Sequence, residues 1–195
     1  MTYTSKARPK TLSAALGLAT AAVLIALPSP AFGAGSGGVG TGGTGTGDSP
    51  PTGTTTPGGT AKLKNGYAIP PADAPLKVVR AIEAANEIVK GKSYCLGGGH
   101  SKWKSKCYDC SGSISYALGK YGAGVLDAPM PSGSFSNWEK GGKGAWITTY
   151  SNSGHMYAVI AGLRLDTSMT VGDGPGWSTQ LRAGGGYVKR HPRGL

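Results

Sequence analysis

Acidic residues are scarce in this chain: 9 Asp and Glu stand against 20 Lys and Arg, giving a net charge of +11 over 195 residues. A strongly basic balance favours anionic polymers as partners. The basic residues are scattered, without a basic helix or an alternation of basic and aromatic residues, so nucleic acid is not expected as a partner. The charge points instead to acidic glycans or to the anionic polymers of a cell wall.

Long apolar runs are also lacking, apart from residues 12–27 near the start. This run follows three basic residues, and the small residues Ala31 and Gly33 stand at −3 and −1 of a cut before Ala34. These features predict a secretory signal peptide over residues 1–33. The run is interrupted by small and polar residues and ends at a proline, so a transmembrane anchor is not expected. No Arg-Arg pair is present, which favours the general secretion route.

Large apolar residues are nearly absent from the segment that follows. Residues 34–61 are rich in Gly, Thr and Pro, and such a segment cannot bury enough surface to offset the entropy of ordering. We therefore expect a disordered linker there and a single domain over residues 62–195. Removing the signal takes away three basic residues and no acidic one, which leaves a net charge of +8. The mature protein is expected to be a secreted monomer, extracellular or associated with the cell wall, without membrane insertion.

Cysteine is sparse, and its count is odd: Cys95, Cys107 and Cys110. An odd count in an exported chain suggests one disulfide and one free thiol. A Cys95–Cys107 bridge would close a 13-residue loop, contribute roughly 3 kcal/mol and leave Cys110 free, and we prefer this pairing. Two alternatives stay open. Cys107 and Cys110 form a C-x-x-C motif, although no βαβ pattern surrounds it. The three cysteines and His100 could also bind zinc, although their spacing fits no common knuckle and an oxidising compartment disfavours thiolate ligands.

Cys110 stands where a helix over residues 110–120 is expected to begin. Asp109 occupies the N-cap position, and Ile114 and Leu118 repeat at helical spacing. Backbone N–H groups at a helix start carry partial positive charge, which favours a thiolate over a thiol. Cys110 is therefore a candidate catalytic nucleophile, with a buried structural cysteine as the alternative.

The remaining pattern predicts one further helix and several antiparallel strands. The glycine run 97–99 is not a phosphate-binding loop, because no Gly-Lys-Ser/Thr sequence follows it. Since a helix with a thiol precedes a set of strands, the fold class is α+β. The predicted elements are a helix from Asp73–Pro75 to about Lys90, ended by Gly91, an extended piece at 93–96, a Gly/Pro-rich loop at 121–144, and strands at 145–150, 155–161, 163–167 and 186–191.

A cysteine nucleophile needs a base, and the histidines are His100, His155 and His191. His155 stands at the start of a predicted strand, directly after a turn, from where it could project into a cleft. If the next turn is centred near Gly162, the carboxylate of Asp166 approaches the His155 ring and can orient it. A surface histidine and a solvated aspartate are the alternatives. His191 is a second candidate for the orienting residue or a substrate contact, and His100 is interpreted as a loop residue.

Three segments together resemble the NlpC/P60 family of cell-wall cysteine peptidases. They are Tyr94 to Gly98 (YCLGG), Asp109 to Gly112 (DCSG), and the Gly154-His155 pair before an apolar strand. The resemblance covers about residues 74–195. It implies a compact papain-like fold, with the nucleophile helix packed on an antiparallel β-sheet. It also implies hydrolysis of stem-peptide bonds in peptidoglycan, such as that between D-glutamate and a diamino acid, through a covalent thioester and without a metal or other cofactor.

The resemblance also implies roles for single residues. By the matching positions, Cys110 is the nucleophile and His155 the general base. Tyr94 lines the site and supports the oxyanion, while Asp109 and Ser111 shape the cysteine loop, whose backbone N–H groups help to hold the oxyanion.

The chain departs from the family pattern at the third catalytic position. The family commonly has His, Asn or Gln about twelve positions after the base, whereas here Asp166 is eleven and Thr167 twelve positions after His155. We assign the role to Asp166, which is chemically the better orienting group. Cys95 and Cys107 lie within the motif region but take no part in the family's mechanism. Two other functions stay open: a non-catalytic wall-binding or interaction module on the same fold, and an N-acetylmuramoyl-L-alanine amidase.

Overall fold

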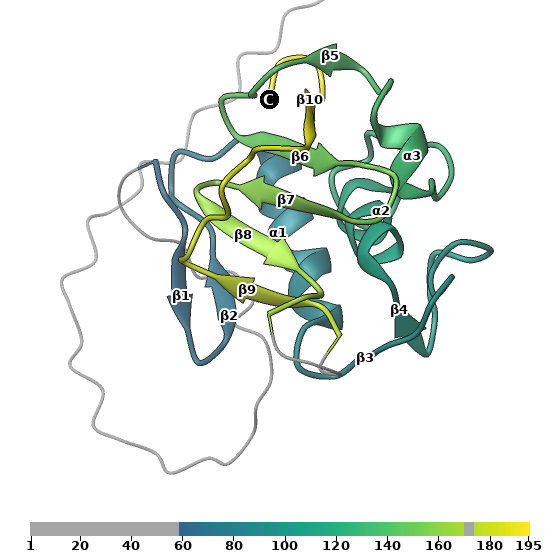
Figure 1. The fold of residues 1–195 in the computed structure, drawn as a ribbon. Coiled ribbons are helices and arrows are strands. Elements are labelled where there is room, and N and C mark those ends of the chain that lie inside the picture. Colours follow the sequence, from purple (N-terminus) through teal and green to yellow (C-terminus); the bar gives the residue numbers. More distant parts are fainter. Residues whose placement is uncertain (1–58, 170–173) are drawn as a thin grey trace, which may run out of the picture. The chain divides into compact units, whose positions relative to one another are not determined.

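The computed structural model describes residues 59–169 and 174–195 (Figure 1). The predicted signal peptide at 1–33 and all but the last three residues of the predicted linker lie outside the described residues. The backbone N–H of Ala61 donates to the carbonyl oxygen of Ala161 at 2.8 Å, so the chain already contacts the sheet at that point. No helix in the described part of the chain is long and apolar enough to cross a membrane.

A six-stranded antiparallel sheet forms one layer of the domain (Figure 1). Three consecutive strands form a meander at its centre, and the last strand returns to pair on the outer side of the first of these three. The residues that follow the turn at 151–155 begin the second meander strand. Because this strand pairs antiparallel with the third, its start lies next to the end of the third strand. In spatial order, the strands are β5 (Lys140–Gly141), β10 (Val188–His191), β6 (Ile147–Ser151), β7 (Met156–Ile160), β8 (Leu163–Asp166) and β9 (Gly176–Ser178).

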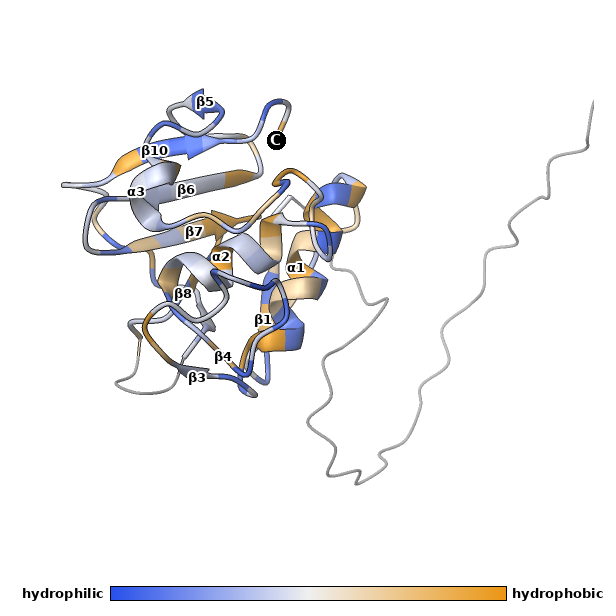
Figure 2. Ribbon diagram, turned by 90° about the vertical axis from the view of Figure 1, so that its right-hand side faces the viewer, coloured by the Kyte–Doolittle hydropathy of each residue, from blue (hydrophilic) through white to orange (hydrophobic). Residues whose placement is uncertain are grey.

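Two helices, α1 (Leu76–Ile88) and α2 (Cys110–Leu118), form the second layer and lie side by side against one face of the sheet (Figure 2). Helix α1 carries both hydrophobic and hydrophilic residues, and the buried ones recur at helical spacing, which is typical of a helix with one buried face. All nine residues of α2 are buried, because this helix is covered by α1 and by strands β7 and β8. On β7, Met156 and Ile160 belong to the shared core, so Tyr157 between them points to the opposite face.

A β-hairpin precedes the helices and consists of β1 (Lys62–Lys64) and β2 (Tyr67–Ile69). Asn65 and Gly66 connect the strands with φ values of 52° and 81°. Both residues adopt the left-handed conformation that a two-residue type I′ turn requires, and Asn-Gly is the sequence that best tolerates it.

The buried side chain of Asn86 on α1 ties three elements together. Its amide donates to the carbonyl oxygen of Ala68 at 2.8 Å, and its oxygen accepts from the N–H of Ala68 at 3.0 Å and from Nε1 of Trp177 at 2.9 Å. Because every polar atom of this buried amide finds a partner, it fixes β2 and β9 against α1.

The structure confirms the α+β class and most of the predicted elements. The two predicted helices are α1 and α2, and the four predicted strands are β6, β7, β8 and β10. The prediction of an unbroken loop over 121–144 is wrong, because this segment contains a short helix and an edge strand. Their few residues give no periodic pattern. The elements that the sequence analysis did not predict are β1, β2, α3 (Ser132–Phe135), β4 (Cys107–Tyr108), β5 and β9, while the extended piece at 93–96 corresponds to β3 (Ser93–Tyr94), which pairs with β4 in parallel.

Candidate active site

Cys110 is the first residue of α2, and Asp109 caps this helix as predicted. One carboxylate oxygen of Asp109 accepts from the backbone N–H of Gly112 at 2.7 Å, which satisfies one of the free donors at the helix start. The other oxygen accepts from the N–H of Gly97 at 3.0 Å. The buried carboxylate therefore fixes both the start of the helix and the glycine loop beside it.

The two glycine-containing segments of the site fit closely against each other. The carbonyl oxygen of Gly98 accepts from the N–H of Asp109 at 3.1 Å. A Cβ atom on Gly112 would collide with this same carbonyl, and one on Gly98 would meet the sulfur of Cys95 and the carbonyl oxygen of Cys107. No larger residue fits at Gly98 or at Gly112. This close fit is a physical reason for the YCLGG and DCSG segments to occur together.

Cys95 and Cys107 form a disulfide with a Cα–Cα distance of 5.6 Å, and Cys110 is free. This arrangement confirms the preferred pairing. It excludes a Cys107–Cys110 redox pair and removes two thiolates from the zinc set considered above. Among the described residues, no group of three or more His, Cys, Asp and Glu side chains is placed to hold a metal ion.

A side chain in the β6–β7 turn fixes the backbone at His155. The amide oxygen of Asn152 accepts from the N–H groups of Gly154, at 3.0 Å, and His155, at 2.8 Å. The N–H of Asn152 in turn donates to the carbonyl oxygen of His155 at 3.0 Å. This compact turn positions the imidazole immediately before strand β7 begins. The turn was predicted from the sequence, but the role of Asn152 was not, although asparagine is typical of turns that a side chain closes.

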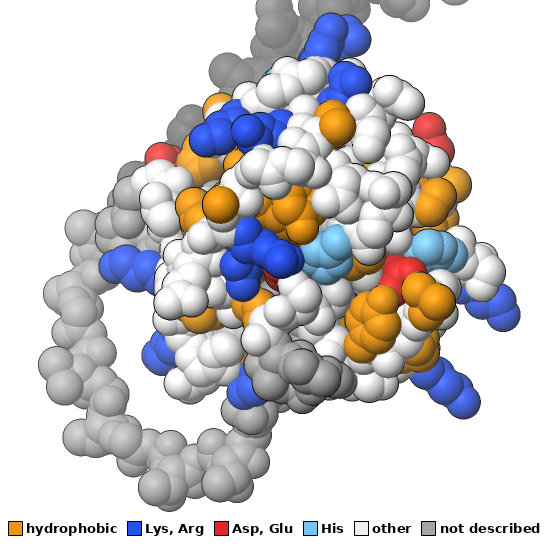
Figure 3. Space-filling model, in the orientation of Figure 1, with side chains coloured by type: hydrophobic (Ala, Val, Ile, Leu, Met, Phe, Trp, Pro, Cys, Tyr) orange, Lys and Arg blue, Asp and Glu red, His pale blue; other side chains and the backbone are white. Residues whose placement is uncertain are grey.

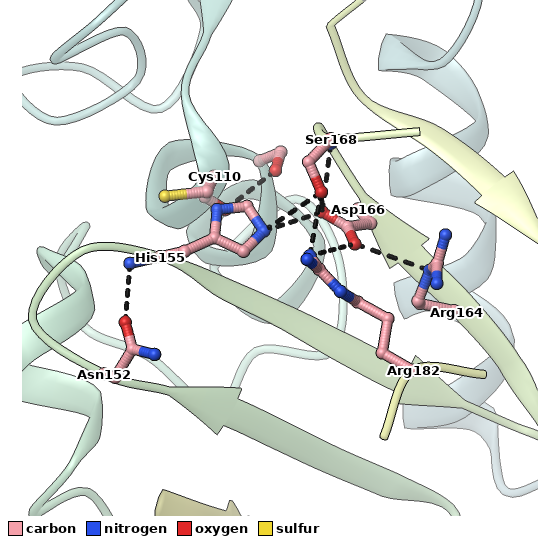
Figure 4. A network of polar contacts seen from close by, with 8 residues as sticks. Cys110, Asn152, His155, Arg164, Asp166, Ser168 and Arg182 are labelled. Atoms are coloured by element: carbon pink, nitrogen blue, oxygen red, sulfur yellow. Dashed lines mark hydrogen bonds and ion pairs between the residues drawn. The ribbon is translucent and has the colours of Figure 1, made fainter. Parts of the chain in front are cut away.

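The ring of His155 lies between Cys110 and Asp166 (Figure 4). Its Nε2 is 2.9 Å from Oδ1 of Asp166, so Nδ1 is the ring nitrogen that remains for the thiol of Cys110. The hydrogen bond to Asp166 and then that to Cys110 raise the pKa of His155 to about 9, while burial opposes the rise. The side chain keeps 22% of its surface exposed, so a substrate can reach it.

Asp166, at the end of β8, is fully buried. Burial by itself would raise the pKa of this carboxyl, but the hydrogen bond and charge of His155, with two hydrogen bonds from Ser168, more than offset it and leave the pKa below its ordinary value. The N–H and the hydroxyl of Ser168 each donate to Oδ1 at 3.1 Å. The carboxylate is therefore held ionised at the position where it orients the imidazole.

Two arginines face the other oxygen of this carboxylate (Figure 4). Nε of Arg164 lies 3.4 Å and Nη1 of Arg182 lies 3.2 Å from Oδ2 of Asp166, and Arg182 also donates to the hydroxyl of Ser168 at 2.8 Å. The sequence analysis did not assign either arginine to the site. Strand alternation could have indicated Arg164, which is two residues before Asp166 and so on the same face, but nothing local indicates Arg182.

Tyr94 lies at the rim of the site, with 43% of its surface exposed. Partial burial and then the nearby negative charges of Cys110 and Asp109 raise the pKa of its hydroxyl, so this group lies near the thiol and stays protonated at neutral pH. Ser111, in contrast, is buried, and its hydroxyl donates to Asp109 at 3.1 Å. Tyr94 can contact a substrate, whereas Asp109 and Ser111 shape the loop around the cysteine.

His100 lies in the glycine loop, as predicted, but it also contacts the residues on either side of Cys110, which was not predicted. Its Nε2 lies 3.0 Å from the carboxylate of Asp109 and 2.8 Å from the hydroxyl of Ser111. Because one ring nitrogen makes both contacts, these three residues do not form a second catalytic triad, in which the two ring nitrogens face different partners. His100 instead supports the cap of α2. His191 lies elsewhere: its Nδ1 donates to the carbonyl oxygen of Gly142 at 3.2 Å.

A free thiol, an imidazole and a buried carboxylate thus follow one another in the order that nucleophilic thiol catalysis requires. Comparison with protein-family models matches no family, and comparison with curated proteins finds no match. Among solved structures, the P60 domain from an antigen of M. avium subspecies paratuberculosis is similar to part of this chain, with 18% sequence identity and a TM-score of 0.40. The alignment covers 58% of this chain and 93% of that chain. A likeness this distant adds nothing to the chemistry, which depends on the geometry of the site itself.

Proposed function

We propose that this protein is a secreted peptidoglycan hydrolase, a cysteine endopeptidase that cleaves stem-peptide bonds through a covalent thioester. The observation that supports it most is the contact series from the free Cys110 through His155 to the buried Asp166. The compact papain-like fold of the NlpC/P60 family and the processing of residues 1–33 as an export signal belong to the same proposal.

The proposed reaction has two halves. The thiol of Cys110 gives its proton to His155, and the sulfur attacks the carbonyl carbon of the scissile peptide bond. The resulting oxyanion is held at the start of α2, beside the hydroxyl of Tyr94, before it collapses and the amine leaves with the proton from His155. Water, deprotonated by His155, then attacks the thioester, and the second product leaves as a carboxylic acid while the thiol re-forms.

Asp166 takes no proton in this scheme. It fixes the ring orientation of His155 through the 2.9 Å hydrogen bond and stabilises the imidazolium. The raised pKa of His155 makes its ring a stronger acceptor for the proton of Cys110.

Digestion of purified cell wall tests the proposal. The purified protein is expected to release new amino groups, Cys110→Ala to release none, and His191→Gln, which lies outside the site, to match the wild type. Mass analysis of the fragments separates cleavage within the stem peptide from cleavage of the glycan–peptide link, which would identify an amidase instead. Equal release by the wild type and Cys110→Ala contradicts the proposal, and slow alkylation of Cys110 by iodoacetamide near neutral pH would favour a non-catalytic module.

A further inference from the structure

The face of the sheet opposite the helices has a hollow of about 130 Å³ outside the catalytic contacts. Tyr150 and Tyr157, which pair across β6 and β7, form part of its lining. On the corresponding side of the molecule, Lys and Arg side chains gather over the sheet, with hydrophobic side chains between them (Figure 3). The lining residues used below are Lys143, Tyr150, Tyr157, Arg182, Gly184 and Lys189.

The charge of this hollow is of one sign. Lys143, Arg182 and Lys189 line it, and no acidic residue does. Arg182 is paired with Asp166, but neither lysine forms an ion pair within the described residues. Lys143 and Lys189 therefore line the hollow without an ion-pair partner, which favours the binding of an anionic group.

The walls restrict what can enter. The rings of Tyr150 and Tyr157 are stacked, with centroids 4.6 Å apart and planes 6° from parallel, and the guanidinium of Arg182 lies 5.7 Å from the Tyr157 centroid. A Cβ atom on Gly184 would come within 3.1 Å of both Lys189 and Tyr150, so glycine leaves room for the lysine beside the ring. The hollow is small, about 130 Å³, and it has room for one small acidic group.

Arg182 connects this hollow to the catalytic contacts. It lines the hollow while its Nη1 lies 3.2 Å from the carboxylate of Asp166. We propose that the hollow is a subsite for a free carboxylate of the peptide substrate, bound by Lys143 and Lys189. This inference rests on the proposed function. A substrate carboxylate is favoured over a phosphate-rich wall polymer, because the space admits one end group and shares Arg182 with the site.

Binding to the Cys110→Ala variant tests the subsite without turnover. The probes are a peptidoglycan stem tetrapeptide and the same tetrapeptide with its carboxylates converted to amides. We expect amidation to weaken binding about tenfold, the size of one lost charge-assisted hydrogen bond. Adding Lys143→Gln and Lys189→Gln should abolish this difference. The matched control Lys62→Gln with Lys64→Gln removes two exposed charges on β1 and should keep it.

Each result decides the inference. The inference is overturned if the tenfold preference for the free carboxylates persists in the variant without the two lysines. It is also overturned if Cys110→Ala with both lysines intact binds the two peptides equally. A polyglycerol-phosphate probe could also bind more tightly than the tetrapeptide, through the same lysines. This result would assign the hollow to a phosphate polymer and would also overturn the inference. Wall digestion is measured separately, with the protein that keeps Cys110. If the protein binds the carboxylate but cleaves nothing, the subsite is supported and the proposed hydrolase activity is contradicted.

Discussion

Replacing Asp166 by Asn keeps the shape of the side chain and removes its charge, which makes it a sharp test of the proposed catalytic contacts. In the wild type, the hydrogen bond that His155 donates to Asp166 is the largest cause of the rise in the pKa of His155 from 6.5 to about 9. At 1.36 kcal/mol per pKa unit, this rise corresponds to a preference for the imidazolium of about 3 kcal/mol. In Asp166→Asn, we expect the pKa of His155 to fall well below 9, because the largest cause of its rise is removed and the unneutralised Arg164 and Arg182 disfavour a charged ring, while the contact with Cys110 remains.

The same shift predicts how stability depends on pH. A histidine whose pKa is higher in the folded than in the unfolded state stabilises the fold fully below pH 6.5, and this contribution fades as the pH rises through 9. The free energy of unfolding of the wild type should therefore fall by up to about 3 kcal/mol between pH 6.5 and 9. Asp166→Asn should lose most of this dependence.

Catalysis should respond more strongly than stability. We expect kcat/KM for wall peptides at pH 7 to fall by about 10⁴-fold in Asp166→Asn, the scale of the loss for the equivalent change in a Ser-His-Asp triad. The loss should appear in kcat, because Asp166 is buried behind the ring and does not touch the substrate.

An NMR titration of the His155 ring measures the pKa directly, with His155→Gln used to assign the signal. Asp127→Asn, which removes an exposed carboxylate elsewhere, serves as the control and should leave the titration unchanged. A wild-type ring that titrates near 6.5, or a ring that still titrates near 9 in Asp166→Asn, refutes the reasoning.

Three further predictions concern the residues around the nucleophile. Removing the disulfide by Cys95→Ser with Cys107→Ser should lower the free energy of unfolding by roughly 3 kcal/mol, as measured by urea denaturation, and an unchanged midpoint contradicts this. His100→Ala should slow the alkylation of Cys110 by iodoacetamide several-fold and lower the free energy of unfolding by about 1 kcal/mol. His100→Gln should restore part of both losses, because a side-chain amide can still donate to Asp109. Asn152→Ala leaves two turn N–H groups without their acceptor, so kcat should fall with little change in KM; a rise in KM alone would count against this role.

The sequence was most informative where local rules determine the structure. Asp109 before an apolar helical repeat identifies the cap and first turn of α2. The proximity of His155 and Asp166 follows from the short β7–β8 hairpin, because a tight turn leaves little choice of register. The odd cysteine count and the position of Cys110 at a helix start favoured the Cys95–Cys107 pairing without determining it, and the structure confirms it.

Other elements could not be predicted, and one was overlooked. The hairpin β1–β2 has a strong local signal in Asn65-Gly66, which the sequence analysis did not use. The short elements α3, β5 and β9 have too few residues for a period to show. His100 and Arg182 join the site only through tertiary contacts, from a glycine loop and from the β9–β10 connection, so no sequence spacing indicates them.

The choice of aspartate as the orienting residue explains the two arginines. A neutral amide or imidazole at this position would need no counter-charge, but a fully buried carboxylate is costly unless it is paired. His155 forms an ion pair with it only while the ring is protonated, and the proposed catalytic cycle requires the ring to lose its proton. Arg164 and Arg182 remain charged throughout, so they keep Asp166 ionised at every step. In the thiolate–imidazolium form, three positive groups then face two negative ones, which leaves the site with a net positive charge that favours an anionic substrate.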